Sequence, residues 1–243
     1  MAELHRSIES RHLACARLHR LHALRLRRWY FGDQTALRPV FMTAVAQDLG
    51  MDSAAVTLFG QTGEELLVAA SDVTARAAHD LEQLIGEGPA RDALDGKEFV
   101  TAGSPGMAAR WPQYGPALSE LGVRSVVAVP LHSSRVLGSL CVFTGNGGVH
   151  TDTGPATEEM GDTLANTVLL ASYGATDDGA PHGTLFDDAD YFGAVHQAVG
   201  MVAVQCGCGV DTALAMLRAR AFADSLDIAE IARRVLQDGY QLC

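Results

Sequence analysis

The stretch GEGPARD, residues 86–92, is the part of this sequence that most resembles a glycine-rich phosphate-binding loop. The common phosphate-binding loop needs G-x-x-x-x-G-K-[ST], because backbone amides cradle the phosphates while the lysine reaches the terminal one. Residues 86–92 lack both that lysine and the hydroxyl residue after it. We therefore predict a turn followed by a helix cap, and no nucleotide site.

Side chains arranged for catalysis are missing from the rest of the sequence. It has no serine nucleophile elbow, no H-E-x-x-H helix and no kinase signature. Acidic residues do not cluster at strand ends in the manner of a phosphate-accepting receiver domain. The sequence predicts no catalytic residue, and we expect that the protein is not an enzyme.

Cysteine is the next residue type that carries chemistry. The five cysteines are Cys15, Cys141, Cys206, Cys208 and Cys243. None shows C-x-x-C spacing, and Cys206 and Cys208 have no matching second pair, so we predict no metal site. Reduced thiols in a cytoplasmic protein are the expectation.

Composition sets the class of protein. Of the 243 residues, 48% are hydrophobic and 19% are charged, which indicates a folded chain. The net charge of −11 argues against attraction of the whole protein to nucleic acid or an anionic membrane, though a local basic face stays open. No stretch approaches the ~18 apolar residues of a membrane helix. We expect a cytoplasmic protein with no membrane partner.

Residues 1–38 form an arginine- and histidine-rich extension, which we predict to be helical. His5, His12 and His19 recur every seven residues and so lie roughly on one face of a helix. Such a helix suits a pH sensor, an arm that binds nucleic acid, or a solvated lead-in segment.

Residues 39–173 have the pattern of one sheet with helices packed on it, an α+β arrangement. Short runs rich in β-branched residues and bounded by turn residues predict strands. The predicted strands are 54–59, 66–70, 98–101, 125–131 and 136–143, with a hairpin joining the last two. The predicted helices are 39–49, 76–94, 110–121 and 155–173.

The tail is predicted to be a separate all-α unit. Residues 174–184 are rich in Gly and Asp and form a linker. Residues 185–243 show three helical patterns, with Tyr191 placed in the first, which Gly207 and Gly209 end. Asp227 and Glu230 have capping-box spacing at the start of the third.

Three stretches of the tail carry a resemblance to a known family. They are QAVGM, ALAMLRARA and IAEIARRVL, which resemble an ANTAR domain, a three-helix RNA-binding output module of bacterial antitermination regulators. The matching positions are Gln197, Ala198, Gly200, Ala213, Leu217, Arg218, Ala221, Ala229 and Ala232.

The middle of the chain is similar to a GAF domain, a PAS-like sensory fold. The stretches that carry this resemblance are IGEGPARDAL, RWPQYGPALSELGVRSVVAVPL and LGSLCVF. Together the two resemblances imply an α+β protein in which a GAF sensor, residues 39–173, precedes a small all-α ANTAR unit, residues 185–243.

The resemblances also imply a function. The tail binds paired hairpins in leader RNA as a homodimer, and the sensor responds to a small molecule, a redox state or a partner. The RNA-binding candidates are Gln197, Ala198, Gly200, Arg218, Arg220, Arg233 and Arg234.

A ligand of the sensor would lie between sheet and helices. Candidate lining residues are Phe59, Phe99, Trp111, Tyr114, Cys141 and Phe143. Core packing is the alternative role for each. The cofactor stays unknown, with haem ligation by His79 or His132 left open.

The alternative function is a protein-interaction or dimerisation module with weakened RNA binding. Val199 and Gln205 stand where ANTAR domains often carry basic residues. From Asp187 onward, four arginines face eight acids, a balance of −4, and phosphate contacts dominate nucleic-acid affinity. A continuous arginine stripe favours RNA binding, whereas an acidic surface favours a protein partner.

Overall fold

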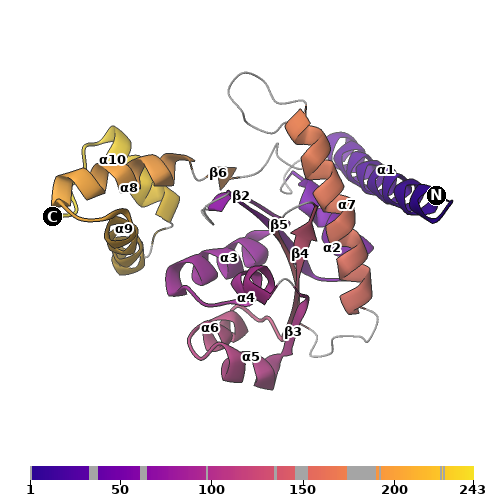
Figure 1. Ribbon diagram of the computed structural model, residues 1–243, viewed down its shortest axis with the longest axis horizontal. Helices are drawn as coiled ribbons and strands as arrows, with labels where there is room; N and C mark the ends of the chain where they lie inside the picture. The colour runs from indigo at the N-terminus through magenta and orange to yellow at the C-terminus, as the bar shows by residue number, and fades with distance from the viewer. Residues whose placement is uncertain are drawn as a thin grey trace.

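The computed structural model describes residues 2–32, 38–60, 65–96, 98–133, 136–145, 153–173, 190–191, 193–224, 226 and 228–243. Its centre is an antiparallel six-stranded sheet with the order β3-β4-β5-β1-β2-β6 (Figure 1). The strands are β1 (Ser53–Phe59), β2 (Glu65–Ala70), β3 (Val100–Gly103), β4 (Ser125–His132), β5 (Val136–Thr144) and β6 (Asp190–Tyr191). The first five lie within about two residues of the predicted strands, as expected for β-branched runs between turn residues.

Two hydrophobic cores lie on opposite faces of this sheet, because successive side chains of a strand alternate in direction. In β4, Val126 and Ala128 join one core, whereas Val127 and Val129 join the other. The first core is covered by α3 (Val73–Ile85), α4 (Pro89–Gly96), α5 (Ser104–Arg110) and α6 (Tyr114–Glu120). The second is covered by α1 (Ala2–Phe31), α2 (Phe41–Asp48) and α7 (Thr153–Tyr173) (Figure 1).

The C-terminal helical unit consists of α8 (Gly193–Cys206), α9 (Val210–Asp224) and α10 (Ile228–Gln237). Its buried residues are Val195, Ala198, Val199, Val202, Ala213, Leu217, Ala221, Ile231, Ala232 and Val235. Small side chains at these positions let three short helices approach closely. Among the described residues no single helix is long and apolar enough to cross a membrane; α8 and α9 together, bent by 105°, meet the length and composition of a span.

Two predicted helices are divided in the structure. The segment predicted as one helix over 76–94 is two helices, α3 and α4, because Gly86 takes a φ of 83° and ends α3. The helix predicted over 110–121 begins at Tyr114, and α5, with Pro105 in its first turn, precedes it. Proline there is a start signal, since its missing amide would have no helical partner.

Tyr191 is corrected from helix to strand. It pairs with Leu67 in β6, which extends the sheet beside β2, and α8 begins only at Gly193. The backbone of the β2 edge offers hydrogen bonds that outweigh the helical spacing of the sequence. The predicted linker 174–184 and the capping residue Asp227 lie outside the described residues.

The expectation of reduced cysteines is wrong at two positions. Cys206, the last residue of α8, and Cys243 form a disulfide across 37 residues of sequence. Cys208 is free and half-buried close by, and Cys141 is free and buried in β5. The disulfide fastens the end of the chain to the C-terminal helical unit.

Candidate functional site

The turn between α3 and α4 is organised by a buried carboxylate. Glu82 of α3 accepts hydrogen bonds from the backbone amides of Ala90, at 3.3 Å, and Arg91, at 2.9 Å, at the start of α4. A Cβ on Gly88 would lie 2.4 Å from the Glu82 carboxyl carbon, so this close approach requires glycine. The predicted turn and helix cap are confirmed, and the capping group comes from Glu82.

Glu82 is also an electrostatic centre of the interior. Burial raises its pKa to about 7, against the effect of the two amide hydrogen bonds. Its proximity contributes to raising the pKa values of the Tyr114 hydroxyl and the Cys141 thiol, which burial raises most. A buried carboxyl group therefore affects the pKa values of a buried phenol and a buried thiol between the sheet and its helices.

A second polar group lies beside the first, between β1, β2 and α3. The Nδ1 atom of His79 lies 3.2 Å from the Thr57 hydroxyl. The Nε2 atom lies 3.4 Å from the Glu65 carboxylate, at the start of β2. Both ring nitrogens thus face protein groups, which disfavours His79 as the haem ligand that the sequence left open. His132, the other candidate, is exposed at the end of β4.

The two members of this pair are kept neutral by burial. Burial raises the pKa of Glu65 to about 8 and lowers the pKa of His79 to about 3. Arg76 and Arg91 push the His79 pKa in the same direction, since a nearby cation disfavours a charged imidazole. At neutral pH the carboxyl group therefore holds its proton beside a neutral imidazole.

Arginines from two parts of the chain meet Glu65. Arg91 of α4 lies 3.8 Å from its carboxylate. Arg218 of α9 acts on the same carboxyl group and lowers its pKa. Burial in turn lowers the pKa of Arg218. The polar interior therefore reaches from the sheet to the C-terminal helical unit.

The predicted ligand-lining residues divide into two sets. Trp111, Tyr114, Cys141 and Phe143 are buried in the core beneath α3–α6. The Tyr114 hydroxyl is buried and has no hydrogen-bond partner among the described residues, which suits a small polar ligand. Phe59 is half-buried at the end of β1, and Phe99 is 45% exposed near the start of α7, so neither joins this set.

The predicted RNA-binding residues on α8 are corrected in one case. Gln197 and Gly200 are exposed. Ala198 is fully buried and packs in the core of the unit, so it has no surface to offer RNA. Small residues at fixed spacing can serve the packing of helices or the contact with RNA. Their spacing in the sequence does not tell these two roles apart.

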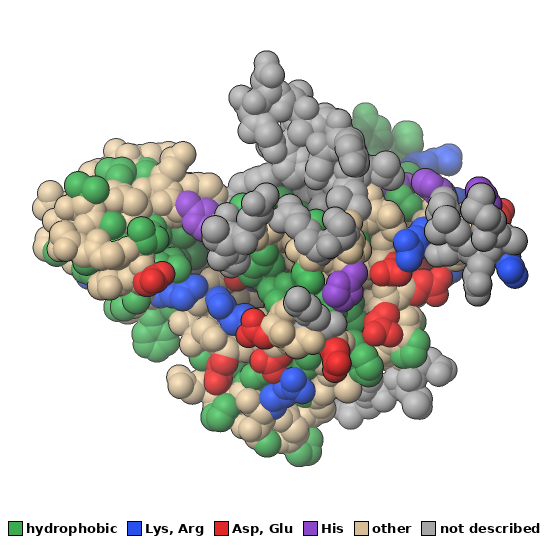
Figure 2. Space-filling view, viewed as in Figure 1, with side chains coloured by type: hydrophobic (Ala, Val, Ile, Leu, Met, Phe, Trp, Pro, Cys, Tyr) green, Lys and Arg blue, Asp and Glu red, His purple; other side chains and the backbone are tan. Residues whose placement is uncertain are grey.

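The four predicted arginines each have a polar partner. Arg218 donates to Gln83 of α3 at 3.1 Å. Arg220 pairs with Asp224 at 2.9 Å and stacks on Tyr240. Arg233 and Arg234 both pair with Glu230. On the face shown in Figure 2, basic side chains gather where the C-terminal helical unit meets the rest of the molecule, with acidic side chains close by.

Within one chain, the basic N-terminal helix does not add its arginines to the basic surface near the C-terminal helical unit. The helix α1 lies at the opposite end of the molecule from α8–α10 (Figure 1). Its Arg11 pairs with Asp162 of α7, and Arg17 pairs with Asp48 of α2, each at 2.8 Å. These cations attach α1 to the sheet's second face.

Sequence reasoning missed the acidic members of the interior, Glu65 and Glu82. Carboxylates are rarely buried, so composition and periodicity assign them to the surface. The close spacing of Gly86, Gly88 and Pro89 after Glu82 was the available signal, since it indicates a sharp turn that an acidic side chain can cap.

The central part of the chain is an α+β domain with an antiparallel sheet, helices on both faces and a polar interior. A family profile described as GAF domain matches residues 40–171, more than half of the chain. The chain therefore belongs to the GAF domain family. The match ends before the three C-terminal helices. No curated protein matches this sequence.

Three solved structures are similar to part of this chain at low identity. A domain assigned to a two-component sensor histidine kinase protein of Sinorhizobium meliloti 1021 is 17% identical, over 55% of this chain and 90% of that one, with a TM-score of 0.42. The GAF domain region of a membrane protein from Geobacter sulfurreducens PCA is 14% identical, over 53% and 88%, with a TM-score of 0.40. The chromophore-binding domain of an unusual bacteriophytochrome from R. palustris is 12% identical, over 63% and 60%, with a TM-score of 0.33.

Proposed function

We propose that the protein is a signal-responsive, RNA-binding antitermination regulator. In this proposal the GAF domain receives the signal and the C-terminal helical unit binds hairpins in nascent leader RNA. One observation carries the proposal. Residues that resemble an ANTAR domain form the buried core of three short helices, namely Ala198, Ala213, Leu217, Ala221 and Ala232, while Gln197, Gly200, Arg220 and Arg233 lie outside.

The sensor half of the proposal rests on the buried polar groups. Tyr114 and Cys141 are buried in the core beneath α3–α6, and the nearby Glu82 affects the pKa of each, so a small molecule bound there would lie near a hydroxyl, a thiol and a carboxyl group. A ligand that changes the position of Glu82 would also move α4, because Glu82 caps that helix. Glu82 itself lies on α3, which contacts α9, so in this proposal the signal reaches the C-terminal helical unit through α3.

Two contacts link the sensor to the output unit. The Nε2 atom of His196 lies 2.7 Å from the backbone carbonyl of Glu65, and Arg218 donates to Gln83. In this conformation Arg218 is half-buried and engaged by the sensor. RNA binding by Arg218 requires this contact to open, so the docked conformation is the resting state of the proposed regulator.

A specific observation favours the second candidate, a protein-interaction module. Arg220 is paired with Asp224 of its own helix, and Arg233 and Arg234 share the one carboxylate of Glu230. The unit also exposes apolar side chains, with Phe222 72% exposed and Val204 84% exposed. Paired cations release fewer counterions from RNA, so this arrangement lowers the electrostatic part of RNA affinity.

RNA capture from cells that express the tagged full-length protein separates the two functions. The test variant is Arg220→Ala with Arg233→Ala, and the matched control is Arg110→Ala, an exposed arginine of α5 in the GAF domain. Enrichment of leader transcripts with paired hairpins, lost in the double variant and kept in the control, supports RNA recognition. Equal background from all three proteins contradicts it and favours the protein-interaction module.

A further inference from the structure

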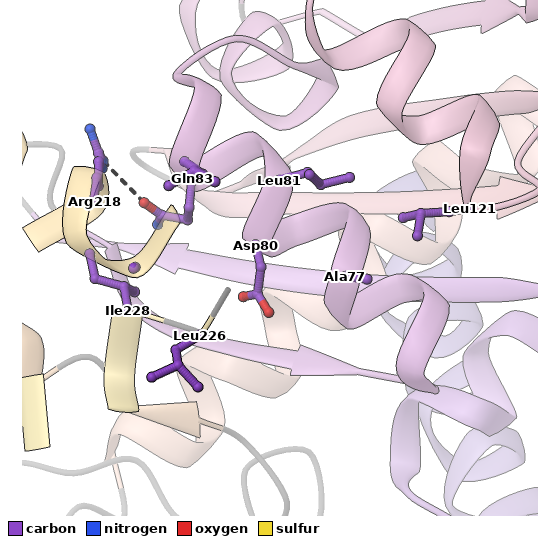
Figure 3. A pocket seen from close by; sticks show the side chains of 10 residues that line it. Ala77, Asp80, Leu81, Gln83, Leu121, Arg218, Leu226 and Ile228 are labelled. Atoms are coloured by element: carbon purple, nitrogen blue, oxygen red, sulfur yellow. Dashed lines mark hydrogen bonds between the residues drawn. The ribbon is translucent and has the colours of Figure 1, made fainter. Parts of the chain in front are cut away.

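A hollow separates the outer side of α3 from the C-terminal helical unit. Its volume is about 300 Å³. Leu81, Leu84 and Leu121 form its wall on the GAF side, and Leu226 and Ile228 form the wall opposite (Figure 3). This space lies outside the domain, on the side of α3 away from the sheet, and so it is separate from the interior with Tyr114.

One end of the hollow is cationic. Arg218 lines it and also lines a second hollow of about 410 Å³, which shares Leu84 with the first and contains Gln113. The Nε atom of Arg218 is buried and has no hydrogen-bond partner among the described residues. Its Nη2 atom donates to Gln83, so the guanidinium retains donors for an acceptor at the junction of the two hollows.

The charges around the hollow favour an anion. Asp80 is the acid in its lining, and Arg76 donates to both of its oxygens, at 2.9 and 3.1 Å. The neighbouring Glu65 is held in its neutral form at pH 7 by burial. Arg218 and Arg91 therefore leave an excess of positive charge at the polar end. An unpaired guanidinium at the edge of an apolar space binds carboxylate better than a neutral group.

We propose that this hollow binds a small molecule with an apolar aliphatic or aromatic body and one anionic head group. The body would lie against the leucines and Ile228, and the head group would accept hydrogen bonds from Arg218. A volume of about 300 Å³ is at the lower end of small-molecule sites, which are mostly apolar with a few placed polar groups.

Because its walls come from both the GAF domain and the C-terminal helical unit, occupancy of the hollow changes how firmly the two are held together. Binding itself does not depend on RNA. The further step, in which occupancy changes RNA binding by Arg218, rests on the proposed function.

Calorimetric titration of the full chain with decanoate tests the binding site, using decanol as the uncharged probe of equal length. Arg218→Gln removes the charge, and Arg220→Gln, on the same helix but outside the lining, is its control. Ala77→Trp fills the hollow, and Val73→Trp, at a position of α3 that is 75% exposed and outside the lining, is its control.

We expect saturable binding of one decanoate per chain, weakened at least about tenfold by Arg218→Gln and by Ala77→Trp. The two controls should stay within about twofold of the natural sequence, and decanol should bind more weakly than decanoate. Uptake that does not saturate, or equal affinity of all variants, or tighter binding of decanol, would overturn the proposal. If circular dichroism shows that Ala77→Trp does not fold, Arg218→Gln decides. The titration contains no RNA, so a failure of the RNA function leaves its result unchanged.

Discussion

The absence of a side chain at Gly88 allows a buried carboxyl group to pack inside the GAF domain. The Glu82 carboxyl group occupies the place where a Cβ of residue 88 would stand. Because Glu82 is buried and accepts two backbone hydrogen bonds, it cannot move aside without losing them.

We expect Gly88→Ala to lower the free energy of unfolding by about 1–3 kcal/mol, the usual cost of an overpacked or unpaired buried group. The control is Gly106→Ala in α5, where an added Cβ meets no atom within 4 Å. That change should be neutral or stabilising by up to about 1 kcal/mol. Urea unfolding measures both, and equal effects of the two substitutions would contradict the role given to Glu82.

Glu65 predicts a pH dependence. Its pKa is about 8 in the folded chain and 4.5 ordinarily, so between these values the folded protein holds a proton that the unfolded chain has released. Stability contributed by this group is present below pH 4.5 and is lost as the pH rises towards 8. In the Glu65→Gln variant this loss is absent.

The free energy of unfolding of Glu65→Gln, relative to the natural sequence, should therefore increase from pH 5 to pH 8. The upper limit is about 1.4 kcal/mol per pH unit. Urea unfolding at several pH values measures it, with the exposed Glu120→Gln as control. Parallel pH profiles of Glu65→Gln and the natural sequence would show that Glu65 titrates normally in the folded protein.

At the scale of single residues, the sequence predicts the burial of apolar side chains better than the burial of polar ones. Trp111, Tyr114 and Phe143 lie in the core because large apolar groups are driven from water wherever the chain allows. Glu65 and Glu82 depend on specific polar partners, a histidine side chain for the first and two backbone amides for the second. Those partners are set by the fold and leave no periodic signal in the chain.

At the scale of the elements, the C-terminal helical unit is small, since its three helices comprise 14, 15 and 10 residues. Units of this size often need additional cross-links. The disulfide between Cys206 and Cys243 supplies one, and it also holds Tyr240 near Arg220.

We expect Cys243→Ser to destabilise this unit by about 2–4 kcal/mol, the typical effect of losing such a cross-link. Cys208→Ser, which removes a free thiol nearby, is the matched control. Amide hydrogen exchange of α8–α10 reports the local change without unfolding the GAF domain. Unchanged protection in Cys243→Ser would mean that the helices alone stabilise the unit.

The predicted helices and strands were correct where side-chain periodicity determines the structure. They were wrong where backbone geometry determines it. The strands β1, β4 and β5 follow directly from their β-branched runs. The division of 76–94 depends on the positive φ of Gly86, and β6 depends on an open sheet edge. Neither feature alters the hydrophobic pattern along the chain.

At the scale of the whole molecule, we propose that α1 takes part in a homodimer. Leu13, Leu24 and Phe31 fall on one stripe of this helix, since separations of 11 and 7 residues bring them to nearly the same angle. They are 65%, 48% and 78% exposed. The exposed Arg20 and Arg27 lie on the same stripe of this 30-residue helix, so the face is mixed, and we expect its three apolar side chains to pack against a second copy.

Sedimentation velocity should show a dimer for the natural sequence and a monomer for Leu24→Glu, because a buried charge without a partner opposes association. Val204→Glu, at an exposed apolar position of α8, is the control and should remain a dimer. Monomers from all three proteins would contradict a dimer, and loss of the dimer in the control alone would move the interface to α8.

The pairing of β6 with β2 has a consequence for how the molecule responds to dilution. Residues 190–191 join the sheet directly before α8, so the chain itself tethers the C-terminal helical unit to the edge of the GAF sheet. The partners meet at a local effective concentration that does not fall when the protein is diluted in the cell. A change in expression level alone therefore leaves the C-terminal helical unit held against the GAF domain.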